Sequence, residues 1–509
     1  MRALARCFGI GLLVLSYGSA GMAQSSGGTG GGVVGGVIGG GGGTVGGVGG
    51  TAGGIVSGVG GTVGGVGGAV GGGLGGLSGP ISGIGSTING VGGGISSGSQ
   101  TIGGRFVSTG SSVTEQITRE DIEIELESNL NQLEYSLWAR SVPPATLLDL
   151  RKLRLAQLVA NNPHMLEMDG AGNPTRRGRL VAIDPSRADL RGAAKAGFRV
   201  AASERDQSLG VTIVVLAVPP KMTAYHAMQL IRRSAPTINV EFDHLFEPAG
   251  GPLAASSVAL AGNMAVAAAS GRPLIGMIDG GVAQNPALAT ATIEQKGFAG
   301  PPQATGHGTA VASLIVGSNG KFRGAAPGVP LLVGDVYGGN PAAGSALAVV
   351  KAMSWIAANR PCVINVSLVG PRNRLVERAV KAAQARGIKI VAAVGNDGPA
   401  APPLYPASQP GVIAVTGVDA TNRALAEAGR PLHLDYSAPG AEMAAALPGK
   451  GYANVRGTSF AAPFVSARLA LTGSTARLDA EASKKGHGRI GRGIVCGDCR
   501  IAPRKVGAK

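Results

Sequence analysis

The feature that most restricts the fold of this chain is an alternation of short apolar strands with helices between residues 274 and 472. Segments such as Val391-Ala392-Ala393-Val394 are apolar on both faces, which is typical of parallel strands covered by helices on both sides. We therefore expect an α/β domain over residues 272–475. Strands are predicted at 274–278, 330–336, 362–367, 388–394 and 411–417, and helices at 307–317, 343–359, 373–386 and after Ser459.

Four polar residues stand where these apolar segments end or begin, which is where open α/β sheets place their sites. Asp279 ends one predicted strand and Asn396 follows another, whereas His307 and Ser459 each precede an apolar helix. Taken singly, each has a structural explanation as a turn former or a helix cap. Together they supply an acid, a base, an amide donor and a nucleophile, which predicts an activated serine.

These four stretches resemble the catalytic motifs of the subtilisin-like serine proteases, the subtilase family, whose Asp, His, Ser chain order is the same. The resemblance extends from about Pro273 to Thr472. It implies a subtilisin-like parallel sheet with helices on both faces, and hydrolysis of protein or peptide substrates through an acyl-enzyme. Three further segments take part in the match: Gly324-Ala325-Ala326-Pro327, Asn365-Val366-Ser367-Leu368 and Tyr405-Pro406-Ala407.

The resemblance assigns a role to each catalytic position. His307 would take the proton from Ser459 and return it to the leaving amine, while Asp279 would hold the imidazole tautomer. The side-chain amide of Asn396 and the backbone N–H of Ser459 would stabilise the oxyanion. These residues are the expected catalytic set.

The resemblance also identifies a strand that would bind substrate. Ser367, Leu368 and Val369 would pair with an extended peptide, and Gly395 would border the same cleft. The family often has glycine at the position of Val369, so the pocket differs there, and Ala392 to Val394 suggest only that it is apolar. No cofactor is expected. No metal is expected either, because the catalytic stretches lie close together and leave little room for long calcium-binding loops.

Two segments precede the folded part. Residues 1–23 carry Arg2 and Arg6, an apolar run and small residues, which predicts a signal peptide and a secreted, periplasmic or cell-surface protein. A membrane anchor is the alternative, but the run is short for a spanning helix. Most of the 88 glycines lie early in the chain, and residues 24–114 are too glycine-rich to build a core. This segment is expected to be a disordered spacer, or else an adhesive surface mat.

Two regions separate the glycine-rich segment from the α/β domain. Residues 115–170 are leucine-rich, with helices predicted at 120–138 and 145–160, and they suggest no chemistry. Residues 175–250 predict a β-α-β-β-α-β order, which is ferredoxin-like. Its position resembles the family's inhibitory prodomain, which would act as an intramolecular inhibitor. A plain accessory domain is the alternative. Processing is expected in the Ala-, Gly- and Ser-rich segment from Glu247 to Gly271, which contains the linker at 251–271, without a preferred bond.

The C-terminal residues 476–509 are basic and contribute to the net charge of +16. Nucleic acid is not expected as a partner because only 4% of residues are aromatic. A solvated face or attraction to an anionic cell surface is favoured. Cys496 and Cys499 form a C-x-x-C pair for which a disulfide is favoured over metal binding or redox exchange. Cys362 begins a predicted core strand and is expected to be a buried free thiol.

The sequence thus predicts a secreted serine endopeptidase made as an autoprocessed zymogen. Two other functions remain open. One is a subtilase-like binding or surface protein without turnover, and the other is a glycine-rich surface protein whose protease domain only processes its own chain.

Overall fold

The computed structural model describes residues 144–249, 273–449 and 451–508, all of which belong to one structural unit. The signal peptide expected at 1–23, the glycine-rich segment at 24–114, the helix at 120–138 and the linker at 251–271 lie outside the described residues. No helix in the described part of the chain is both long and apolar enough to cross a membrane.

A parallel sheet of seven strands forms the larger part of the described chain, in the order β16-β15-β14-β12-β7-β11-β8. Every pairing in it is parallel. This sheet confirms the predicted α/β fold class. Its strands are β7 (Ile275–Asp279), β8 (Ile293–Gly297), β11 (Leu331–Asp335), β12 (Val363–Val366), β14 (Lys389–Ala393), β15 (Ile413–Val418) and β16 (Tyr436–Pro439).

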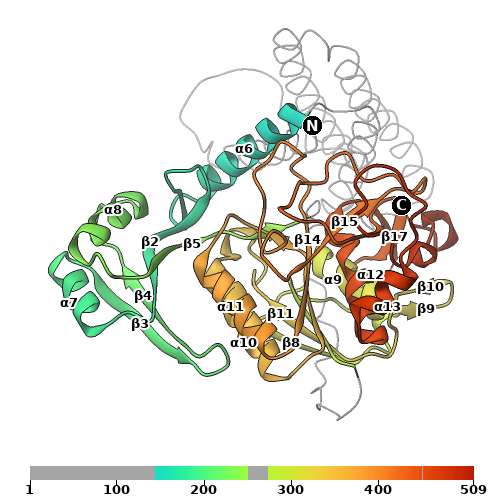
Figure 1. The fold of residues 1–509 in the computed structure, drawn as a ribbon, viewed down its shortest axis with the longest axis horizontal. Helices are drawn as coiled ribbons and strands as arrows, with labels where there is room; N and C mark the ends of the chain where they lie inside the picture. Colours follow the sequence, from blue (N-terminus) through green and yellow to red (C-terminus); the bar gives the residue numbers. More distant parts are fainter. Residues whose placement is uncertain (1–143, 250–272, 450, 509) are drawn as a thin grey trace, which may run out of the picture. The chain divides into compact units, whose positions relative to one another are not determined.

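Helices cover both faces of this sheet (Figure 1). α9 (Gly306–Val316) and α12 (Ala462–Thr472) pack on one face, and α10 (Ala346–Ala358) and α11 (Arg374–Ala385) on the other. The residues of β14 alternate between them, since Val391 and Ala393 face the first pair of helices and Ile390 and Ala392 the second. Both faces of the strand are therefore buried, which explains its unbroken apolar sequence.

Several elements around the sheet were not predicted. α13 follows α12, and a 3-10 turn, η4, lies just before α12. The strand β13, which follows β12, contains Leu368 and Val369 of the predicted substrate-binding strand. Two hairpins pair β9 with β10 and β17 with β18. Their bounds are β9 (Ser318–Asn319), β10 (Phe322–Arg323), β13 (Leu368–Val369), β17 (Met443–Ala446), β18 (Tyr452–Val455), η4 (Thr458–Phe460) and α13 (Thr475–Glu481).

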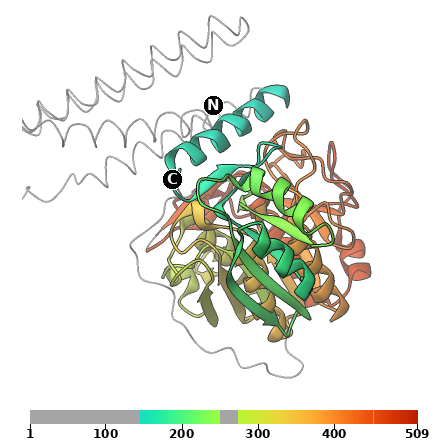
Figure 2. The same cartoon turned by 90° about the vertical axis from the view of Figure 1, so that its left-hand side faces the viewer.

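A smaller antiparallel sheet precedes the large one and has the predicted ferredoxin-like order. β5 and β4 flank β2, and β3 forms the far edge. Both helices cover one face, which Figure 2 views from the helical side. The other face packs against α10 and α11 of the large domain. Its elements are β2 (Pro174–Ile183), α7 (Arg187–Lys195), β3 (Arg199–Asp206), β4 (Val211–Ala217), α8 (Ala224–Ser234) and β5 (Val240–His244).

Segments at both ends of the small sheet extend beyond its ferredoxin-like core. α6 (Pro144–Asn161), which was predicted at 145–160, leads into β1 (Leu166–Met168), and β1 pairs with the start of β2. After β5 the chain enters β6 (Glu247–Pro248), which pairs with β13 of the large domain.

The basic C-terminal region is not a detached tail. Val495 and Cys496 are buried, and Ile494 forms bridges with Ser437 and Ser483. Part of the basic region at 476–509 is therefore packed against the large domain and is not a solvated face. Several of its cations are held within the chain: Arg492 pairs with Asp435 and Asp479, and Arg500 donates to the carbonyls of Val418 and Asp419.

Candidate active site

Three of the predicted residues meet at the carboxyl edge of the large sheet. Asp279 is the last residue of β7, His307 lies in the first turn of α9, and Ser459 lies in η4 just before α12. The close approach of α9 to the turn after β7 requires glycine, because a Cβ on Gly308 would lie 2.2 Å from the carbonyl oxygen of Gly280. Because Gly308 allows this close approach, the ring of the neighbouring His307 lies at the end of β7.

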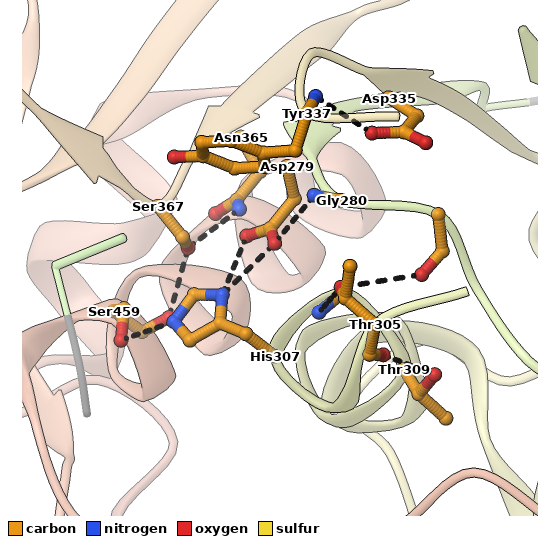
Figure 3. Close-up of polar contacts among 12 residues, drawn as sticks. Asp279, Gly280, Thr305, His307, Thr309, Asp335, Tyr337, Asn365, Ser367 and Ser459 are labelled. Atoms are coloured by element: carbon orange, nitrogen blue, oxygen red, sulfur yellow. Dashed lines mark hydrogen bonds and ion pairs between the residues drawn. The ribbon is translucent and has the colours of Figure 1, made fainter. Parts of the chain in front are cut away.

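The three side chains form a hydrogen-bonded line (Figure 3). Nδ1 of His307 lies 2.9 and 3.0 Å from the carboxylate oxygens of Asp279, and Nε2 lies 3.0 Å from Oγ of Ser459. All three residues are at most 3% exposed. With Nδ1–H donating to Asp279, Nε2 accepts the Ser459 hydroxyl proton, so the arrangement can generate a serine nucleophile.

A second carboxylate lies beside Asp279 on the neighbouring strand. Asp335 ends β11 in register with Asp279, and burial raises the pKa of the Asp335 carboxyl, against the lowering effect of three backbone N–H donors. Those donors belong to Gln303, Tyr337 and Gly338. Asp335 therefore holds the loops at this edge of the sheet through these hydrogen bonds. Figure 3 draws no hydrogen bond or ion pair between Asp335 and His307.

A network of buried polar side chains holds the backbone of the nucleophile. Ser466 in α12 donates to Asn365 Oδ1 at 2.9 Å, Asn365 donates to Ser367 Oγ at 2.9 Å, and Ser367 donates to the carbonyl of Ser459 at 2.8 Å. Neither Ser466 nor the side chain of Asn365 was predicted from the sequence to have a role. The signal for Asn365 was a polar residue inside the apolar strand Val-Ile-Asn-Val.

The predicted oxyanion donors converge on one carbonyl group, that of Ala249. The backbone N–H of Ser459 donates to its oxygen at 3.1 Å, and Nδ2 of Asn396 donates to the same oxygen. The amide orientation of Asn396 follows from its other contact, because its Oδ1 accepts from the N–H of Thr458 at 3.0 Å. Asn396 and Ser459 together form a site for a carbonyl oxygen that becomes negatively charged.

The predicted substrate-binding strand is occupied by the chain itself. β6 pairs antiparallel with β13, with Leu368 opposite Pro248 and Val369 opposite Glu247. The N–H of Ala249 then donates to the carbonyl of Ser367 at 2.9 Å. Residues 247–249 therefore lie as an added strand, which is how extended peptides bind an exposed sheet edge.

Phe246, just upstream, fills a pocket of its own. Its backbone N–H donates to the carbonyl of Gly344 at 2.6 Å, and its side chain is fully buried. The ring packs against Gly370, where a Cβ would lie 2.8 Å from the ring carbons. Tyr337 donates its hydroxyl to the Phe246 carbonyl at 3.0 Å, and burial raises the Tyr337 pKa well above its usual range. The phenol therefore remains a neutral donor at this position.

The side chain of Ala249 belongs to an apolar cluster that includes two larger residues. Ala249, Val369 and Leu404 lie in the same buried cluster, with Ala249 only 2% exposed. Gly395, predicted to border the cleft, has a positive φ of 93°. A Cβ built on Gly395 would lie 2.7 Å from Cδ1 of Leu404 and 3.5 Å from Cγ1 of Val369. The side chains of Leu404 and Val369 therefore both lie close to the backbone of Gly395.

Two arginines of α6, which the sequence analysis did not single out, reach the same edge. Nε of Arg151 lies 2.9 Å from Asp397, the residue after the oxyanion asparagine. Arg154 contacts both Asp397 at 3.2 Å and Glu247 of β6 at 2.8 Å. The leucines around them predicted an amphipathic helix, and ion pairs with residues 93 to 246 positions away leave no local signal in the sequence.

The disulfide expected between Cys496 and Cys499 is present, whereas the burial expected for Cys362 is not. Cys496 and Cys499 form a disulfide. Cys362 is free, but it is exposed, and its Sγ donates to the carbonyl of Leu274. The prediction that Cys362 is buried was wrong because it lies just before β12 (Val363–Val366), outside the covered part of the strand.

The domain that contains these residues is similar to a known protein family and to several characterised proteins. Residues 270–484 match the model of the subtilase family of peptidases. The chain is 35% identical over 173 residues to the major intracellular serine protease of Bacillus subtilis (strain 168), covering 33% of this chain and 54% of that protein. It is 36% identical over 169 residues to subtilisin Savinase of Lederbergia lenta, covering 33% of this chain and 62% of that protein. The chain thus spans between half and two thirds of the length of these relatives.

A solved structure supports the same fold. The crystal structure of fervidolysin from Fervidobacterium pennivorans, described as a keratinolytic enzyme related to subtilisin, superposes with a TM-score of 0.53. The match has 22% sequence identity and covers 66% of this chain and 62% of that one. At this identity the likeness concerns the fold alone.

Proposed function

We propose, from the premise that residues 270–484 match the subtilase family of peptidases, that the chain is a serine endopeptidase that hydrolyses peptide bonds through an acyl-enzyme on Ser459. The observation that carries the proposal is the hydrogen-bonded line from Asp279 through His307 to Ser459, ending beside a carbonyl oxygen that Asn396 also holds. A nucleophile, a base, an orienting acid and an oxyanion site are thus adjacent.

The first half of the reaction follows from these contacts. Ser459 Oγ attacks the substrate carbonyl carbon as its proton passes to Nε2 of His307. The negative charge then develops on the oxygen that faces the N–H of Ser459 and Nδ2 of Asn396, where a donor of this kind lowers the barrier by roughly 3 to 4 kcal/mol. Protonated His307, stabilised by Asp279, gives its proton to the leaving amine nitrogen, and the C–N bond breaks.

The second half reverses these roles. A water molecule gives a proton to His307 and attacks the acyl carbon, the oxyanion forms again in the same place, and the proton returns to Ser459 Oγ as the ester bond breaks. The product acid then leaves. Substrates are proposed to be proteins or peptides in an extended conformation, because Ser367 to Val369 offer a strand edge.

The small domain is proposed to be an inhibitory prodomain, so that the chain is made as a zymogen. Supporting this, β6 lies in the substrate position and the Ala249 carbonyl lies in the oxyanion site. The first bond to be cleaved would then be Ala249–Gly250. After cleavage, residues up to Ala249 would stay bound as a product, held also by the ion pairs of Arg151 and Arg154.

The decisive experiment compares the full chain with Ser459→Ala and with Ser203→Ala, an exposed serine on β3 that serves as the matched control. Wild type and Ser203→Ala should react with a fluorophosphonate probe and yield a fragment that begins at Gly250. Ser459→Ala should do neither. An unlabelled wild-type chain that also leaves an unfolded test protein intact would contradict the proposal. Self-cleavage without cleavage of the test protein would leave a domain that only processes its own chain.

Export is a further part of the proposal, supported by the composition of residues 1–23. Deletion of these residues should retain the protein inside the producing cell, and export that continues without them would contradict it. Association with an anionic surface would have to use cations other than Arg492 and Arg500, which are engaged within the chain.

A further inference from the structure

We propose that this site cleaves after small side chains, and that Val369 and Leu404 set this selectivity by filling the space next to the residue that precedes the cleaved bond. The inference rests on the proposed function, because it specifies the substrate class of the same site. It departs from the sequence expectation, which went no further than an apolar pocket.

The position of the residue before the cleaved bond is determined by its backbone. Ala249 donates its N–H to the carbonyl of Ser367 at 2.9 Å, and its carbonyl oxygen accepts from the N–H of Ser459 at 3.1 Å and from Asn396. Three hydrogen bonds on one residue fix the direction of its Cα–Cβ bond. Any substrate that makes the same three hydrogen bonds must send its side chain into the same space.

Strand alternation determines which residues of the binding strand border that space. Successive residues of a strand point to opposite faces. Val369 belongs to the buried cluster of Ala249, whereas Leu368 belongs to that of Phe246. Val369 is therefore the residue of β13 on the Ala249 side.

Leu404 borders the space from the segment after β14, whose next residue, Tyr405, forms a bridge with Gly370 just after β13. It is 4% exposed and belongs to the same cluster. Together with Val369 it lies close to Gly395, whose missing Cβ would come within 2.7 Å of the leucine methyl. Two branched side chains thus occupy the volume in which a longer substrate side chain would have to lie, and Ala249 itself is almost fully buried, with only 2% of the residue exposed.

A larger residue cannot avoid these side chains by moving outward. Such a shift would lengthen the hydrogen bonds from Ser459 and Asn396 to the carbonyl oxygen, and loss of one such donor lowers kcat by on the order of 10²–10³. If Val369 and Leu404 moved aside instead, they would overpack the buried cluster to which they belong. Steric exclusion at this position therefore acts on the rate of bond cleavage.

The test changes the substrate residue and the pocket in the same chain. Full-length Ala249→Ser and Ala249→Gly should self-cleave at a rate close to that of wild type. Ala249→Phe and Ala249→Leu should self-cleave more slowly, by at least about tenfold on the scale expected for hydrophobic pockets. The pocket variant Val369→Gly with Leu404→Ala should restore cleavage in the Ala249→Phe chain.

A parallel measurement uses peptides that differ only in the residue before the cleaved bond. Wild-type enzyme after self-cleavage should prefer alanine and serine over leucine and phenylalanine in kcat/KM, and the pocket variant should reverse the order. Fluorophosphonate labelling of each variant shows whether its nucleophile is assembled.

The outcomes separate this inference from the proposed function. A labelled wild type that cleaves phenylalanine and alanine substrates equally would overturn the selectivity while leaving the protease intact. A labelled pocket variant that still cleaves alanine but not phenylalanine would show that Val369 and Leu404 do not set it. A wild type without labelling or cleavage would overturn both.

Discussion

The carbonyl oxygen of Ala249 lies 3.1 Å from the backbone nitrogen of Ser459, so a residue from the end of the small domain occupies the place where a substrate carbonyl would be attacked. Ala249 and Ser459 are about 210 positions apart in the sequence. Under the proposed function, this contact corresponds to that of a bound substrate, and the following predictions test the relationship.

Asn396→Ala should lower kcat by on the order of 10²–10³ with little change in KM, because the lost donor acts mainly on the charge of the transition state. The measurement is steady-state hydrolysis of a peptide by the self-cleaved enzyme. Asn454→Ala, an exposed asparagine on β18, is the matched control and should leave both constants unchanged. An equal loss in both variants would count against the oxyanion role.

Arg151→Ala combined with Arg154→Ala should weaken the hold of the cleaved small domain on the protease domain. These ion pairs are partly buried, and their loss is expected to cost about 1 kcal/mol, or roughly a fivefold faster appearance of peptidase activity after self-cleavage. Lys152→Ala, which removes an exposed pair with Asp149 on the same helix, is the control. The lag before activity, followed over time, should shorten only in the double variant.

Phe246→Ala should loosen the inserted strand more strongly, because a fully buried aromatic ring is lost. Truncations of this kind typically cost about 3 to 5 kcal/mol. Tyr225→Ala, which shortens an exposed ring on α8, provides the comparison. Gel filtration of the self-cleaved chains should show separated fragments for Phe246→Ala and a retained complex for Tyr225→Ala. A retained complex in both variants would show that the Phe246 pocket contributes little to binding of the cleaved small domain.

Acid should weaken the small domain through Asp169. Burial acts to raise the pKa of Asp169, but hydrogen bonds from His244, Asn173 and Ala171 outweigh it and lower the pKa to about 2. The stabilisation is therefore complete above about pH 4 and is lost as the pH falls towards about 2. His244 also contacts Asn373, the N-cap residue of α11, so this group lies where the two domains meet.

The corresponding measurement is urea unfolding in a Ser459→Ala background, which prevents self-cleavage. Asp169→Asn should be less stable than its parent by about 1 to 2 kcal/mol at pH 7, after allowance for solvent screening. Near pH 2 the two should be equally stable. A difference that does not change with pH would mean that the carboxylate charge of Asp169 is not responsible.

The strands and helices of the large domain were predictable where their residues are apolar in a continuous run. β7, β11, β12, β14 and β15 and the helices between them lie within a few residues of the predicted ranges. The edge strand β8 was missed because Glu294 and Lys296 interrupt its apolar residues, and the hairpin of β17 and β18 was missed because Met443–Ala446 lacks β-branched side chains.

In the candidate site, too, the residues that were predicted are those with a recognisable local sequence pattern, and those that were missed depend on distant partners. Asp279, His307, Asn396 and Ser459 are each recognisable from their neighbours in sequence, since each stands at the junction of an apolar element and a glycine turn. Arg151 and Arg154 have no such neighbours. Their partners are distant carboxylates, and an amphipathic helix alone does not indicate which charges will face a second domain.

By itself, the sequence determined the α/β fold class, the ferredoxin-like order of the small domain and the identity of the residues that could do the chemistry, because these depend on local apolar periodicity and on turn residues. Only the tertiary structure decided what occupies the cleft and how large its pocket is. The contacts of Ala249 with Ser459, and the shared cluster of Ala249, Val369 and Leu404, join segments that are distant in the chain. Their distances are set by the packing of two domains, for which the sequence carries no local pattern.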